Sequence, residues 1–246
     1  MERKQFGSHV SESYNQYLED LFNKVLEMGG LVERQLENSV AALQTFDVER
    51  AQEVVQMDSL INHDEIEIDR LCVRVLARQQ PAASDLRLVV SAIRIAVDLE
   101  RMGDEVVKIA KLIINLNKIG NPDCLDLHRY KALIDIAASA SSMLKTVLNA
   151  FARLDVKDSA WVVEEERRVD AVYKESLAEL KQQFKQANGD VECFLELVYA
   201  LRASERLTDH ARNIGETIIY LVNGQDVRSV DSERLAELLK EFSHAK

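Results

Sequence analysis

The chain of 246 residues contains little proline and little glycine, with two and eight copies respectively. A β-rich chain needs a turn about every ten residues, and Gly and Pro are prominent among the residues that build turns. Long stretches here contain neither residue, which excludes an all-β fold. Hydrophobic residues make up 47% and charged residues 30% of the chain. This composition favours long helices in a globular protein.

Cysteine is also scarce. Cys72, Cys124 and Cys193 are odd in number, far apart and without CxxC spacing, which argues against a disulfide framework or a structural zinc site. A reducing cytoplasm is the compartment that this pattern favours. No segment approaches about 18 uncharged apolar residues, and the N-terminus carries charges but no apolar leader core. We therefore expect a cytoplasmic protein that does not insert into a membrane.

The chain has fewer basic than acidic residues. It contains 31 Lys and Arg and 42 Asp and Glu, which give a net charge of −11. This charge opposes approach to a phosphate backbone or an anionic lipid surface, so nucleic acid is not an expected partner. The sequence has no GxGxxG, P-loop, GxSxG or HExxH motif. The enzyme classes that carry these motifs therefore find no support, and we expect no catalysis.

Breaker residues divide the chain into six predicted helices. The strongest breaker is Asn117-Lys-Ile-Gly-Asn-Pro-Asp123, near the midpoint. The predicted helices cover residues 11–45, 47–78, 84–117, 127–153, 155–186 and the stretch from the turn at 188–190 to 222. We predict an all-α fold of two tandem three-helix bundles, at 1–118 and 124–230, followed by a tail at 231–246 with a short helix near 232–242.

The two halves are related by internal duplication. Phe46-Asp47-Val48 corresponds to Leu154-Asp155-Val156, 108 positions later. Glu100-Arg101-Met-Gly-Asp104 corresponds to Glu205-Arg206-Leu-Thr-Asp209, 105 positions later, because the second half has the shorter turn. Two copies of about 105 residues indicate paired bundles rather than a solenoid.

Carboxylates occupy helix faces that should be apolar. Glu100 and Asp104 interrupt the apolar stripe of their helix, and an acid or amide strip follows the edge of the preceding helix. Each half therefore offers two such pairs on neighbouring helices. In the first half they are Asp58 with Asn62 and Glu100 with Asp104, and in the second half Glu166 with Asp170 and Glu205 with Asp209.

Two interpretations of these carboxylates stay open: a metal site, or a hydrated structural polar layer. Buried carboxylates repel one another unless they are protonated or bind a cation. Oxygen ligands favour hard cations such as magnesium, manganese or calcium, and iron or zinc are further candidates. A di-iron oxidase would want Glu-x-x-His pairs on core helices, and the spacing occurs only at Glu241 and His244 in the tail.

Arginine and lysine recur every seven residues along the third predicted helix, at Arg87, Arg94, Arg101 and Lys108. This spacing predicts a basic ridge on one helix face. A solvated face is the commoner interpretation. In an acidic chain, we also consider that part of the ridge contacts a partner protein.

The sequence resembles the PhoU family of bacterial phosphate-transport accessory proteins. The resemblance extends from about Phe6 to Arg228. It is carried by Met28-Gly29-Gly30, Pro81-Ala-Ala-Ser-Asp-Leu-Arg87, Glu100-Arg-Met-Gly-Asp104, Asp155-Val156 and Gly224-Gln-Asp-Val-Arg228. The pattern departs from the family at Thr208, where Gly is expected, and at Asn62, where an acid would be a stronger ligand.

The resemblance implies two three-helix bundles with E(D)xxxD metal motifs at the four pairs named above. It also implies a cytoplasmic negative regulator of the phosphate-starvation (Pho) response. Such a protein links the ATPase subunit of the phosphate ABC transporter (PstB) to the sensor histidine kinase PhoR. We also expect a homodimer. The alternative is a carboxylate-bridged metal protein, either a metal store or a di-iron-type oxidase.

Overall fold

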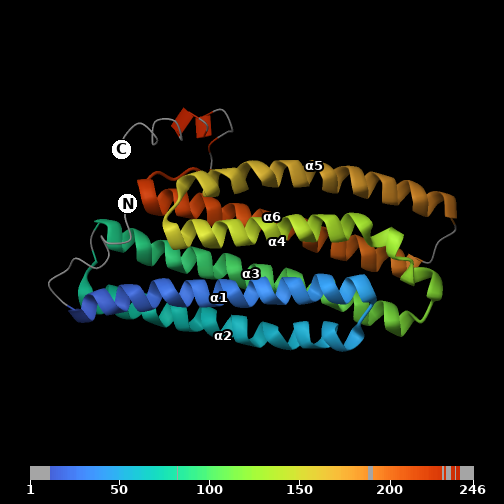
Figure 1. Cartoon of the computed structure of the whole chain (residues 1–246), viewed down its shortest axis with the longest axis horizontal. Helices are drawn as coiled ribbons and strands as arrows, with labels where there is room; N and C mark the ends of the chain where they lie inside the picture. Colours follow the sequence, from blue (N-terminus) through green and yellow to red (C-terminus); the bar gives the residue numbers. More distant parts are fainter. Residues whose placement is uncertain are drawn as a thin grey trace.

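The computed structural model describes residues 12–81, 83–187 and 191–228, together with residues 230, 234, 235, 237 and 238. Within these residues the regular structure is helical, which confirms the predicted all-α class (Figure 1). The long helices are α1 (Glu12–Thr45), α2 (Val48–Gln79), α3 (Ala83–Ile119), α4 (Lys131–Arg153), α5 (Val156–Ala187) and α6 (Val191–Asn223), and two short 3-10 helices, η2 (Pro122–Leu125) and η3 (Leu127–Tyr130), lie between α3 and α4.

Local sequence signals explain the helix ends. Asp47 caps α2, since its side chain accepts a hydrogen bond from the Arg50 backbone N–H at 3.0 Å. Gly224 ends α6 with a φ of 76°, a conformation that suits glycine. The predicted helix at 127–153 starts later than expected. Asp126 caps η3 through the His128 N–H, so the chain makes a 3-10 turn before α4 begins at Lys131.

The two halves, α1 to α3 and α4 to α6, lie side by side (Figure 1). The duplicated helices α3 and α6 make the most extensive contact between them, and α1 also packs on α4. Buried apolar residues of both halves form one continuous cluster. Within it, the ring of Phe22 in α1 stacks on the ring of Phe151 in α4, with 4.5 Å between centroids. The halves therefore share a core.

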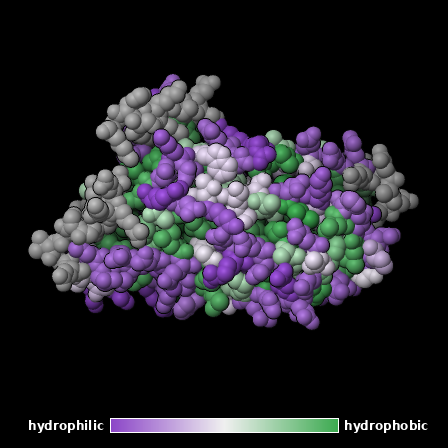
Figure 2. Space-filling model, viewed as in Figure 1, coloured by the Kyte–Doolittle hydropathy of each residue, from purple (hydrophilic) through white to green (hydrophobic). Residues whose placement is uncertain are grey.

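On the face seen in the same view, hydrophilic residues predominate and hydrophobic patches lie between them (Figure 2). Among the described residues, no helix is both long and apolar enough to span a bilayer. In the tail, Leu235 and Leu238 are buried against Val163 and Ile219. Described residues of the tail are helical at 234, 235, 237 and 238. The rest of the predicted helix at 232–242, and the predicted start of the first helix at Ser11, lie outside the described residues.

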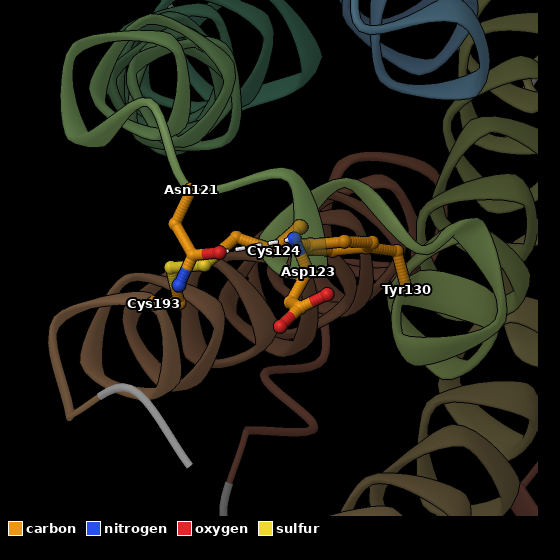
Figure 3. The surroundings of a disulfide bond; sticks show 5 residues. All are labelled: Asn121, Asp123, Cys124, Tyr130 and Cys193. Carbon is orange, nitrogen blue, oxygen red and sulfur yellow. Dashed lines mark hydrogen bonds between the residues drawn. A yellow bond between two sulfur atoms is a disulfide. The ribbon is translucent and has the colours of Figure 1, made fainter.

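Two expectations need correction. Cys124 and Cys193 form a disulfide, with 5.9 Å between their Cα atoms, because packing brings the connector between the halves onto the start of α6 (Figure 3). The basic ridge is also interrupted. Arg87 Nε donates to the Leu221 carbonyl at 3.2 Å, and Arg94 lies over the Tyr220 ring. These two arginines join α3 to α6, whereas Arg101 remains exposed.

Candidate functional site

The first predicted set of oxygen ligands comes together between α2 and α3. These helices are antiparallel neighbours: the Cys72 thiol donates to the Val89 carbonyl, and Ile61, earlier in α2, lies beside Gly103, later in α3. This register places Asp58 near Asp104, whose negative charge opposes ionisation of Asp58. Burial first, and then the charge of Asp104, raise the pKa of Asp58. Burial and the same Asp104 charge raise the pKa of Glu100. We name Asp58, Asn62, Glu100 and Asp104 the α2–α3 cluster.

Several oxygen atoms of this region are buried and lack a hydrogen-bond partner in the described structure. They are Asp58 Oδ1, Asn62 Oδ1 and, from α1, Gln35 Oε1. The Asn62 amide donates to the other Asp58 oxygen at 3.3 Å. Gln35 donates through Nε2 to the Val54 carbonyl at 3.2 Å, which fixes the orientation of its amide and leaves Oε1 inside. Buried oxygens without donors are costly, and a cation or a water molecule would satisfy them.

Gly103 has no side chain that would crowd these oxygen atoms. A Cβ atom at this position would lie 3.4 Å from both Asp58 Oδ1 and Gln35 Oε1, and 3.2 Å from Ile61 Cδ1. The missing side chain therefore lets two partnerless oxygens approach the backbone of α3. The acid spacing that predicts the site does not point to Gln35. In the structure, Gln35 is 0% exposed and lies next to the buried Leu36. In the sequence, the signal for Gln35 is a polar residue among the apolar residues of a helix.

The second predicted set lies between α5 and α6 and is also electrostatically coupled. Burial first, and then the charge of Asp209, raise the pKa of Glu205 to about 7. Burial also raises the pKa of Glu166, against the lowering effect of Arg212. Asp170 contributes to the repulsion on both acids. We name Glu166, Asp170, Glu205 and Asp209 the α5–α6 cluster.

The chain's own cations already pair with most of the α5–α6 cluster. Arg212 contacts Glu166 at 3.3 Å, Lys174 contacts Asp170 at 2.6 Å, and Arg202 contacts Glu205 at 2.8 Å. Sequence analysis did not assign Arg212 or Lys174 a role, although Lys174 lies four residues after Asp170 on the same helix. These ion pairs offset the repulsion that a bound metal would otherwise relieve.

The α2–α3 cluster has less compensation of this kind. Arg101 lies 3.6 Å from Glu100. Within the described residues, Asp58 and Asp104 have no Lys or Arg nitrogen at ion-pair distance. The donor set fits a hard cation, because carboxylate and amide oxygens supply it. In the described ranges, no three His, Cys, Asp or Glu side chains lie close enough together to bind one metal ion. A cation would therefore also need the amide oxygens or a side-chain rotation.

Comparison with known proteins gives consistent matches over most of the chain. The PhoU domain model matches residues 25–113 and 133–218, one segment in each half. One relative is a phosphate-specific transport system accessory protein PhoU homolog from Pseudomonas aeruginosa. It is 42% identical over 229 residues, and the alignment covers 93% of each chain. The Escherichia coli K12 accessory protein PhoU is 33% identical over 239 residues, with 97% of each chain covered.

Solved structures of PhoU proteins are also similar to this chain. The crystal structure of PhoU from Pseudomonas aeruginosa superposes with a TM-score of 0.79 at 41% identity, over 86% of this chain and 100% of that one. A phosphate transport system regulatory protein PhoU from Streptococcus pneumoniae superposes with a TM-score of 0.76 at 28% identity, over 85% and 97% of the two chains.

Proposed function

Because the chain belongs to the PhoU family, we propose that it is an accessory protein that regulates a phosphate-specific transport system. The observation that carries this proposal is the match to accessory proteins over nearly the full length of both chains. The duplicated segments recognised by the domain model coincide with the two halves that carry the carboxylate clusters.

The finer part of the proposal concerns partners. The chain acts in the cytoplasm as a homodimer and keeps the phosphate-starvation response off when phosphate is plentiful. It contacts the transporter ATPase subunit (PstB) and the sensor kinase (PhoR), and it catalyses no reaction itself. The exposed Arg101 and Lys108 on α3 support a protein contact, because Arg is enriched where protein surfaces dock.

The proposal includes cation binding at the α2–α3 cluster. Three buried oxygens without partners and the repulsion between Asp58 and Asp104 favour a magnesium or manganese ion there. Iron and zinc are the alternatives in the same oxygen environment. In the α5–α6 cluster, Arg202, Arg212 and Lys174 compete with a metal, so we propose weaker binding at that cluster.

Elemental analysis of protein purified without chelator separates this regulator from a metal store or a di-iron-type oxidase. A regulator carries at most a few ions per chain and shows no oxygen-dependent redox change. Uptake of many iron ions, or oxygen consumption on addition of ferrous iron, would favour the alternative class.

Co-purification tests the partners. The tagged chain is isolated from phosphate-replete cells that express the transporter and the kinase, and both partners are identified by mass spectrometry. Charge reversal at Arg101 and Lys108 should weaken recovery of at least one partner. Reversal of the exposed pair Arg70 and Arg74 on α2 is the matched control. Recovery of neither partner with the wild-type chain would contradict the proposal.

A further inference from the structure

The Cys124–Cys193 disulfide lies where the two halves are connected. Cys124 belongs to η2, in the connector that follows α3, and Cys193 belongs to the first turn of α6 (Figure 3). The bond spans 69 positions in the sequence, so its covalent loop encloses α4 and α5. The connector is thereby attached to the helix that packs most extensively on α3.

A second set of contacts links the same connector to the first half. The Tyr130 hydroxyl donates to the Cys124 carbonyl at 2.5 Å. The buried Tyr130 ring meets the edge of the Phe46 ring, with 5.4 Å between centroids, and Phe46 follows the last residue of α1. The Asn121 side chain accepts from the Asp123 N–H and holds the turn that precedes Cys124. A change at the disulfide therefore acts on a segment that contacts both halves.

We propose that Cys124 and Cys193 form a reversible thiol–disulfide exchange site, whose reactants are low-molecular-weight thiols such as glutathione and dithiol reductases. The incoming thiolate attacks the sulfur of Cys193, the Cys193–Cys124 bond breaks, and the Cys124 sulfur leaves and takes up a proton. A second thiolate then attacks the mixed disulfide and releases Cys193. Overall, two thiols become one disulfide, and the protein disulfide gains two electrons and two protons.

The position of Cys193 supports this direction of attack. Its residue is 5% exposed, whereas Cys124 is 0% exposed. It lies in the first turn of α6, two residues after the exposed Val191, and helix ends open locally at low free-energy cost. The amide groups of that turn also stabilise a thiolate once it has formed. Reduction and reoxidation thus need only a local opening of the start of α6.

The third cysteine provides an internal control. Cys72 is fully buried between α2 and α3, and its thiol donates to the Val89 carbonyl. Burial raises the pKa of Cys72 to about 12, so its thiolate is rare at neutral pH. We expect Cys72 to stay unmodified while the native fold persists.

The test uses the full-length native chain in buffers with different ratios of reduced to oxidised glutathione. Thiols are trapped with an alkylating reagent and assigned by mass spectrometry. Cys124 and Cys193 should become alkylated together as the reduced fraction rises, and reoxidation should restore the bond. Two results would overturn the proposal: independent alkylation of both cysteines at every ratio, or a bond that survives excess dithiothreitol in the folded protein.

A structural readout completes the test. Reduction of the wild-type chain should lower Tm by roughly 10 °C, because it removes the loop constraint on the unfolded state. It should also raise hydrogen exchange at 120–130 and in the first turn of α6 at least tenfold. Cys124→Ser with Cys193→Ser should behave like the reduced chain, and Cys72→Ser should keep the redox response. Unchanged exchange on reduction of the wild-type chain would contradict a role in holding the connector.

Discussion

Glu105 of α3 and Arg206 of α6 form an ion pair across the contact between the two halves, with 3.2 Å between Arg206 Nη1 and Glu105 Oε1. The same carboxylate oxygen accepts from Lys108 at 2.8 Å. Glu105 is almost fully buried, whereas Arg206 is half exposed. The pair belongs to a row of polar contacts between α3 and α6 that includes Asp98 with His210. These contacts fix the register of the duplicated helices at the rim of their shared core.

Arg206→Ala should lower the free energy of unfolding by about 1 kcal/mol. The loss is small because Lys108 still contacts Glu105 and because half-exposed ion pairs are screened by water. Urea unfolding monitored by circular dichroism measures the difference, with Arg74→Ala on the exposed surface of α2 as the control. Equal stability of both variants would show that the pair contributes nothing to the contact between the halves.

Gly215→Ala should destabilise the fold by about 1 to 2 kcal/mol, despite the higher helix propensity of alanine. A Cβ atom there would lie 3.0 Å from the Ser159 carbonyl oxygen, so α5 and α6 would have to separate. Gly30→Ala is the matched control, because its nearest neighbour is the flexible end of Arg34 at 3.9 Å. We expect that variant to be stabilised by up to about 1 kcal/mol. A stabilised Gly215→Ala variant would contradict the close helix approach.

The stability of the metal-free chain should fall as pH rises from about 4.5 to about 7. Burial and the charge of Asp209 raise the pKa of Glu205 from 4.5 to about 7, so the folded state binds this proton more tightly than the unfolded chain. The favourable contribution is complete below pH 4.5 and is lost as Glu205 ionises. Glu205→Gln should weaken this dependence, to which Glu166 and Glu100 also contribute through their raised pKa values. It should raise stability at pH 8 by about 1 to 2 kcal/mol, after allowance for the lost Arg202 contact.

Denaturation series at several pH values, with a chelator present, check this expectation. Glu53→Gln on the exposed surface of α2 is the control and should leave the pH dependence unchanged. A Glu205→Gln variant with the same pH profile as the wild-type chain would show that Glu205 ionises normally in the folded protein.

Manganese added to the chelated chain should raise Tm by about 5 °C when it is well above its dissociation constant. Asp58→Asn with Asp104→Asn should remove most of this rise, because in the described structure neither carboxylate forms an ion pair, and Lys111 acts on Asp58 only as a more distant charge. Asp170→Asn with Asp209→Asn should keep most of it, since Lys174 already pairs with Asp170. If neither manganese nor magnesium changes the Tm of the wild-type chain, the carboxylates instead form a hydrated structural polar layer.

Local sequence signals predicted the helices well, because breakers and caps act over a few residues. Asp47 starts α2 and Gly224 ends α6, as expected. The spacing places each acid or amide pair on one helix face, and the duplication repeats the pattern in both halves. Metal binding by the eight residues of the α2–α3 and α5–α6 clusters stays a prediction.

The features that sequence analysis missed depend on contacts between distant segments. Cys124 and Cys193 are 69 positions apart, and only the packing of the connector on α6 brings them together. Arg87 belongs to a regular basic row, yet its guanidinium group donates to the Leu221 carbonyl in the other half. Neither arrangement has a local signature, because each depends on how the two halves of the chain pack together.

A reporter of the phosphate-starvation response measures directly whether this chain has the proposed role in regulating a phosphate transport system. The chain is expressed in bacteria that lack their own PhoU, in phosphate-rich medium, and alkaline phosphatase activity is measured beside phosphate uptake. We expect the wild-type chain to lower the alkaline phosphatase activity at least tenfold, to the level of the parent strain. A soluble, folded chain that leaves the reporter fully active and phosphate uptake unchanged would contradict it.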